Sequence, residues 1–134
     1  MTHRKRNEKG AVLLEHALVF LLFFVVLYGI MEFGRIVYLY NSLAGATRGA
    51  ARFAIVHGSR STAPATNDDI RARLLQWGIG FDPAALTVNT TWSPNNAPGS
   101  RVRIDSSYNI SLMTGLIYTA PLRIVSRSEM VISQ

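Results

Sequence analysis

The stretch that decides the fold is Ala11–Met31, which reads AVLLEHALVFLLFFVVLYGIM. It holds 21 residues and one formal charge, that of Glu15. A helix needs about 20 apolar residues to cross the hydrocarbon core of a bilayer. Apolar side chains occupy every side of this helix and leave no polar stripe, as on a helix that faces lipid. The sequence therefore predicts a membrane-spanning helix near the N-terminus.

Positive charge is concentrated ahead of this stretch. The chain of 134 residues has a net charge of +6, and residues 1–10 supply +3 of it, four basic residues against Glu8. A basic flank predicts a cytoplasmic N-terminus and an exported C-terminal part. A cleaved secretory signal peptide is disfavoured, because the nearest small-x-small site, Ala44–Ala46, lies too far beyond the apolar run. The exported part has no basic run interleaved with aromatic residues, so we expect no nucleic-acid partner.

The helical pattern continues past the predicted span. Residues 32–56 contain no proline, and the first strong break is His57-Gly58-Ser59. Small residues recur at every fourth position along this part: Ser42, Ala46, Ala50 and Ala54 on one line, Gly45 and Gly49 on the next. Such lines allow a close approach to the helix backbone. Two interpretations stay open: the chain's own domain covers this surface, or helices of other subunits pack against it.

A small α+β domain is predicted after residue 57. Residues 69–78 have the pattern of a short helix that Asn67 or Asp68 caps, with Ile70, Leu74 and Trp77 on one apolar face. Three runs alternate with a period of two, residues 86–92, 101–112 and 122–132, and residues 93–100 form the first turn. The predicted fold is α+β: a long N-terminal transmembrane helix that extends into a small domain with a short helix and a three-stranded antiparallel sheet.

The predicted sheet has one apolar face, and that face must be buried against another element. The outer half of the long helix is the nearest one. The side chains expected to form the buried face of the second strand are Val102, Ile104, Tyr108 and Ile110. The apolar linker 113–120, which contains Leu116, Ile117 and Tyr118, is expected to rest on the membrane surface or to fill the edge of the core.

The residue types that carry most enzyme chemistry are sparse. The chain has no cysteine, which excludes disulfides and thiol catalysis. His3, His16 and His57 are far apart and have no acidic residues at metal-ligand spacing. Asp68 and Asp69 fit helix-start charges better than an acid pair. We therefore expect no catalytic residue, no metal and no cofactor, and a protein that is not an enzyme.

The junction Lys9-Gly10-Ala11-Val12-Leu13-Leu14-Glu15 is the most informative segment. An acidic residue costs about 2.5–3.5 kcal/mol at the centre of a membrane helix and less near its end, so Glu15 indicates a function. If the chain were cut after Gly10, Ala11 would carry a free ammonium one helical turn from Glu15. The carboxylate could then pair with that amine or with the amine of a neighbouring subunit. The other interpretation is a Glu15 side chain that reaches the headgroup region, and both stay open.

These residues resemble a known family. The short basic leader ending at Gly10, the apolar helix and the Glu at the fifth position after that glycine resemble a class III (type IV) prepilin-type leader. The continuation, YGIMEFGR at 28–35, NSLA at 41–44 and ATRGAAR at 46–52, resembles TadE-like pseudopilins of the tight-adherence (Flp pilus) secretion system. The resemblance is dense over residues 10–56 and weaker over 86–132. One departure is His16, where the family usually has an aromatic residue.

The resemblance implies a minor, pilin-like component of Flp pilus assembly that a prepilin peptidase cleaves between Gly10 and Ala11. It implies a leader (1–10), a long transmembrane helix (11–56) and an exported domain (57–134). The implied partners are other pilins or pseudopilins of a Tad-type system, the inner-membrane pilus assembly platform and the lipid bilayer. The implied location is the bacterial inner membrane or a cell-surface pilus. Glu15 would pair with an N-terminal amine. Helix–helix packing would use Ser42, Gly45, Ala46, Gly49, Ala50 and Ala54.

The competing hypothesis belongs to another class of protein. It is a single-pass membrane-anchored binding or sensing module, whose exported sheet binds a ligand. The two hypotheses differ in the expected N-terminus of the protein in the membrane, which is Ala11 for the pseudopilin and the unprocessed chain for the anchored module.

Overall fold

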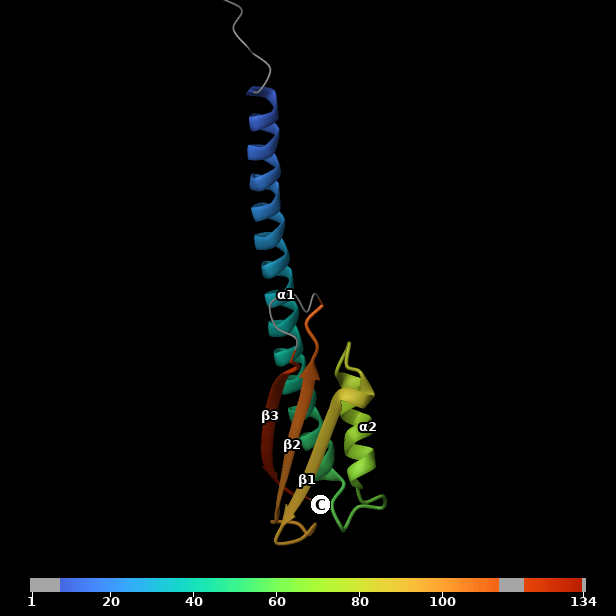
Figure 1. The fold of residues 1–134 in the computed structure, drawn as a ribbon. Helices are drawn as coiled ribbons and strands as arrows, with labels where there is room; N and C mark the ends of the chain where they lie inside the picture. The colour runs from blue at the N-terminus through green and yellow to red at the C-terminus, as the bar shows by residue number, and fades with distance from the viewer. Residues whose placement is uncertain (1–7, 114–119, 134) are drawn as a thin grey trace, which may run out of the picture. The chain divides into compact units, whose positions relative to one another are not determined.

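The computed structural model describes residues 8–113 and 120–133 (Figure 1). The elements in chain order are α1 (Glu8–Val56), α2 (Asn67–Trp77), the short 3-10 helix η1 (Pro83–Ala85), β1 (Leu86–Ser93), β2 (Arg101–Ile110) and β3 (Leu122–Val131). The predicted α+β class is confirmed: a long apolar N-terminal helix, a short helix and a three-stranded antiparallel sheet. The chain divides into two compact units, Met1–Arg35 and Ile36–Gln134, and α1 contributes to both.

The first unit contains the apolar part of α1. Its large aliphatic and phenylalanine side chains from Val12 to Phe33 are exposed, and an 18-residue window with a mean hydropathy of 2.5 has none of its residues buried. Among the described residues, α1 is the one helix long and apolar enough to cross a membrane. An ion pair between Arg35 and Glu32, at 2.6 Å, lies at the end of this unit. A single apolar helix of this kind indicates a membrane anchor.

The second unit has one hydrophobic core, to which α1, α2 and the sheet contribute. The α1 side chains in it are Leu39, Leu43, Ala46, Ala50, Ala51 and Ala54. Ile70 and Leu74 enter it from α2, and β2 supplies Val102, Ile104, Tyr108 and Ile110, all of them 8% exposed or less. The predicted buried face of the second strand is therefore confirmed. Small residues on α1 place the helix backbone close to the elements that cover it.

The sheet has the order β1-β2-β3 with both pairings antiparallel. Leu86 faces Tyr108 in the first ladder, and Ser107 faces Val125 in the second. Gly99, in the turn between β1 and β2, has a φ of 85°, a left-handed conformation that glycine adopts without strain. Ile132, just past β3, exchanges backbone hydrogen bonds with this turn, to the carbonyl of Ser100 at 2.8 Å and from the amide of Gly99 at 2.9 Å.

Helix α2 begins with a capping box, and the residue that caps it is Thr66 instead of the predicted Asn67 or Asp68. The Thr66 hydroxyl accepts from the Asp69 amide at 3.2 Å, and the Asp69 carboxylate accepts from the Thr66 amide at 2.9 Å. Thr66 caps the helix in place of Asn67 or Asp68, because a capping box needs the N-cap residue three positions before the acidic residue, here Asp69. The hydrogen bonds from Thr66 hold the pKa of Asp69 below its ordinary 3.8.

The outer face of the sheet is polar and carries cross-strand ion pairs between β2 and β3. Glu129 pairs with Arg103 at 2.9 Å and with Arg101 at 3.3 Å, and Arg127 pairs with Asp105. The hydrogen bond and charge of Arg103 hold the pKa of Glu129 below its ordinary 4.5. These pairs are exposed, so each contributes little to stability.

Two predictions fall on residues whose structure is not described here. The apolar linker residues Leu116, Ile117 and Tyr118 lie outside the described residues. The basic residues Arg4, Lys5 and Arg6, on which the predicted orientation in the membrane rests, also lie outside them.

Candidate functional site

The predicted cleavage junction lies in the first turns of α1. The helix begins at Glu8, so Gly10 and Ala11 have helical backbones, and both are exposed. A side chain added at Gly10 would meet nothing within 4 Å. The junction is thus exposed and sterically unobstructed, with a helical backbone.

Glu15 lies one helical turn after Ala11 on the same side of α1. Its side chain is exposed, and it makes no hydrogen bond or ion pair with any residue in 8–113 or 120–133. A carboxylate in apolar surroundings is costly to keep charged without a partner. This position therefore suits a carboxylate whose partner is a group that the described residues do not supply.

His16, the residue that departs from the family pattern, bonds within its own helix. Its Nδ1 lies 2.7 Å from the carbonyl oxygen of Val12, one turn earlier. When Nδ1 carries the proton, it donates to this carbonyl and the ring N–H is satisfied locally. The polar ring is thereby accommodated beside an apolar span without involving Glu15.

The small residues of the two predicted lines on α1 differ in how far they are buried. Ala46, Ala50 and Ala54 are at most 2% exposed and belong to the core of the second unit. Gly49 lies against the ring of Trp77, whereas a Cβ at Gly45 would meet nothing within 4 Å. Ser42 is half-buried and Gly45 is exposed. In this single chain the alanine line is covered by the chain's own domain, and Gly45 remains open to another molecule.

A polar contact that sequence reasoning missed joins α1 to the sheet. The hydroxyl oxygens of Thr47 and Ser106 are 2.6 Å apart, and both residues are buried. The Thr47 hydroxyl also lies 2.7 Å from the Leu43 carbonyl, and the Ser106 hydroxyl lies 3.2 Å from the Ser126 carbonyl. The sequence did contain one indication of this contact: Ser106 is a hydroxyl residue among the apolar residues of the buried face, so it needs a hydrogen-bond partner in the core.

Metal ligands do not gather in the part of the chain that the structure describes. Within residues 8–113 and 120–133 no group of three or more His, Asp or Glu side chains could hold a metal ion. The N-terminal part of α1 instead presents an accessible glycine, Gly10, and a carboxylate five positions later, that of Glu15.

Comparison with known families gives a match that covers the N-terminal region. Residues 10–52 match the TadE-like protein family. The match contains Gly10, Ala11, Glu15 and five of the six small residues, and it confirms the resemblance seen in the sequence. It points to a component related to Tad pili and, with the apolar helix, to a membrane anchor. Searches of curated proteins and of solved structures found no match.

Proposed function

We propose that this chain, TadE-like over residues 10–52, is a minor pseudopilin of a Flp/Tad-type pilus and acts in pilus biogenesis or adhesion. The observation that carries the proposal is Glu15: an exposed carboxylate without a partner among the described residues, in an otherwise apolar helix, five positions after an unobstructed glycine. A plain membrane anchor has no use for a carboxylate at this depth.

Processing is the first step of the proposed function. A prepilin peptidase would cut between Gly10 and Ala11, removing residues 1–10 and leaving a mature chain of 124 residues (134 less 10). Gly10 has no side chain, so the scissile backbone can approach the catalytic groups of a protease closely. The new amine at Ala11 would be one turn from Glu15, close enough for an ion pair within the chain or across to a neighbour.

Assembly is the second step. Residues 11–56 would form the helix that joins a bundle of pilins or pseudopilins at the inner-membrane assembly platform. Helix packing would use the line of Ser42, Ala46, Ala50 and Ala54 and the line of Gly45 and Gly49. Of these, Gly45 is the position best suited to contact another subunit, because it is exposed and has open space around it. Residues 57–134 would be the exported domain, with the N-terminus in the cytoplasm.

A second candidate function is a membrane-anchored binding module. The polar outer face of the sheet favours it, because that face carries arginines and hydroxyls in an open hollow. This module would need the helix only as an anchor, so it predicts no cleavage and no role for Glu15.

The mass of the intact protein, purified from membranes of a strain that has the prepilin peptidase, decides between the two. We expect the mass of residues 11–134, with or without methylation of the new amine. Gly10→Leu should leave the full-length mass. The matched control is Gly29→Leu, another helical glycine with no atom within 4 Å of an added Cβ, which should be cleaved normally. A full-length wild-type chain in that strain would contradict the proposal.

Glu15 separates cleavage from assembly. Glu15→Gln keeps the shape of the side chain and removes the charge, so we expect cleavage to persist while co-purification with partner pilins is lost. The matched control is Glu32→Gln, which changes a carboxylate that already pairs with Arg35. A Glu15→Gln protein that assembles as well as the wild type would support the anchored module.

A further inference from the structure

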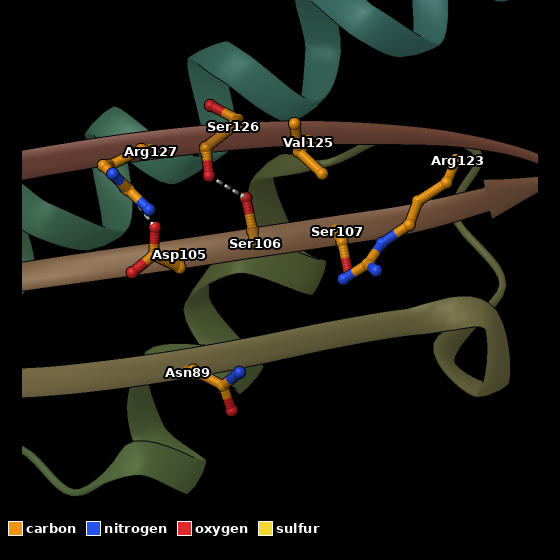
Figure 2. A pocket seen from close by; sticks show the side chains of 8 residues that line it. All are labelled: Asn89, Asp105, Ser106, Ser107, Arg123, Val125, Ser126 and Arg127. Atoms are coloured by element: carbon orange, nitrogen blue, oxygen red, sulfur yellow. Dashed lines mark hydrogen bonds and ion pairs between the residues drawn. The ribbon is translucent and has the colours of Figure 1, made fainter.

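The outer face of the sheet contains a hollow of about 480 Å³. Its lining residues are Asn89, Asp105, Ser106, Ser107, Arg123, Val125, Ser126 and Arg127, and Figure 2 shows that they come from all three strands. The ladder register explains the hollow. The short side chains of Ser107 and Val125 face each other, and the long side chains of Arg123 and Arg127 flank them along β3.

Three of the four arginines on this face form ion pairs, and Arg123 does not do so with the described residues. Arg101 and Arg103 pair with Glu129, and Arg127 pairs with Asp105. Arg123 donates to the Ser107 hydroxyl at 3.2 Å and forms no ion pair with any residue in 8–113 or 120–133. Four arginines against two carboxylates give this face a net charge of +2. One unit of this excess lies at the hollow, where no described carboxylate neutralises Arg123; the other lies at Arg101 and Arg103, which share Glu129.

We propose that this hollow binds a carboxylate side chain from an acidic, extended segment of a partner protein, with Arg123 as the anchoring cation. A guanidinium can donate two parallel hydrogen bonds to one carboxylate, which is stronger than a bond between neutral groups. The Ser107 hydroxyl supplies a further polar contact beside Arg123, and the Asn89 amide supplies one at the other end of the hollow, next to Asp105. Val125, 60% exposed, offers an apolar contact between the two arginines.

The spacing of the arginines specifies the segment further. Arg123 and Arg127 are four residues apart on β3, about 13 Å along a strand. An extended peptide places its own side chains four residues apart at the same distance and on the same side. The segment that fits best therefore carries two acidic residues four positions apart, one at Arg123 and one near Arg127, whose Nε pairs with Asp105 and whose other guanidinium N–H groups can donate to the second carboxylate.

An acidic polysaccharide fits this surface less well. None of the eight lining residues is aromatic, so the hollow has no flat ring on which an apolar ligand face could stack. The recognition available is by charge and hydrogen bonds, which suits side-chain carboxylates on a flexible chain. The hollow lies outside residues 10–52, and the inference does not depend on cleavage of the leader.

The test uses the full chain in detergent micelles and the acetylated, amidated heptapeptide Ser-Glu-Thr-Ser-Thr-Glu-Ser as the probe. Nitrogen-15 NMR would follow the Arg123 side-chain N–H and the backbone amides of Ser107 and Val125. We expect the peptide to shift these signals in low salt, and the same peptide with Gln in place of Glu to leave them unchanged. Equal shifts with both peptides would overturn the proposal.

Variants test the site itself. Arg123→Gln should weaken binding of the acidic peptide about tenfold. Ser107→Leu should weaken it comparably by filling the hollow without changing the charge, so the result does not rest on one variant. Arg52→Gln, an equal charge change on α1, should bind like the wild type. Equal weakening by Arg52→Gln would show general attraction to a basic protein and overturn the site. So would Arg123-dependent binding of polygalacturonate without binding of the peptide.

Discussion

The ring of Trp77 in α2 lies against the backbone of α1 at Gly49, where an added Cβ would come closer than 3.0 Å to Cε3 of the indole. This contact holds the short helix against the long one with a ring that is itself 45% exposed. A side chain at position 49 would therefore collide with the indole ring of Trp77, which explains the glycine there. Gly45, one turn earlier, has no atom within reach of an added Cβ.

The two glycines should respond oppositely to alanine. Gly45→Ala should raise the free energy of unfolding by about 1 kcal/mol, the difference in helix propensity. Gly49→Ala gains the same propensity but must displace Trp77, and overpacking of this kind costs about 1–3 kcal/mol. Urea unfolding of the full chain in detergent micelles measures both. Equal stability of the two variants would show that Trp77 does not rest on Gly49 in solution.

The hydroxyls of Thr47 and Ser106 should be coupled in stability. Three contacts, between the two hydroxyls and to the carbonyls of Leu43 and Ser126, share two hydroxyl protons. Thr47→Val should cost about 1 kcal/mol, because Ser106 keeps a carbonyl acceptor. A double-mutant cycle with Ser106→Ala should give a coupling energy of about 0.5–1.5 kcal/mol. A coupling energy of zero would mean that the hydroxyls do not interact.

Substitution to aspartate should distinguish the two faces of β2. Ile104 is fully buried, so Ile104→Asp places an unpaired charge in the core and should cost several kcal/mol. Arg103, the next residue, lies on the exposed face and pairs with Glu129. Arg103→Asp should cost less than about 1 kcal/mol, since exposed ion pairs contribute little. Chemical denaturation measures both, and similar losses would contradict the register of the strand.

The capping box predicts a loss of stability in acid. Hydrogen bonds from Thr66 hold the folded pKa of Asp69 below 3.8, the ordinary value expected in the unfolded chain. A depressed folded pKa adds stability above the unfolded value, and this contribution is lost as the pH falls from about 3.8 through the folded pKa.

The matched variants of α2 test this effect. Between pH 5 and pH 2.5, Asp69→Asn should lose less stability than the wild type. The neighbouring Asp68→Asn removes a charge from the same first turn but no hydrogen bond of the capping box, so it should change the acid dependence less than Asp69→Asn does. The urea midpoint of the full chain at each pH gives the comparison. An identical acid dependence for Asp69→Asn and wild type would contradict the effect of the cap.

The proposed orientation in the membrane also has a direct test. Arg4, Lys5, Arg6 and Lys9 precede the span, so residues 57–134 should lie on the exported side. Protease added to spheroplasts, which expose the outer side of the inner membrane, should digest this domain in the wild type. Full protection of the domain while a known periplasmic marker is digested would contradict the orientation.

Local pattern determined most of the architecture. The apolar run of α1 identifies a spanning helix without any tertiary information, because a bilayer requires about 20 apolar residues in sequence. The alternation of Val102, Ile104, Tyr108 and Ile110 likewise fixed the buried face of β2, since strand side chains alternate with a period of two. The resemblance to the TadE-like family that matches residues 10–52 was visible in the stretches 28–35, 41–44 and 46–52.

Contacts between distant residues were decided only by the tertiary structure. The sequence places Ser106 on the inner face, but it does not contain the information that Thr47, 59 residues earlier, meets it. Periodicity put Trp77 with Ile70 and Leu74 on one face of α2, yet only packing shows that its ring rests on Gly49. The hollow beside Arg123 arises because strand register sets short side chains between long ones. The periodicity of the sequence indicates which side of its own helix or strand a residue lies on. Which residues of two different elements contact each other depends on how those elements pack in the folded chain.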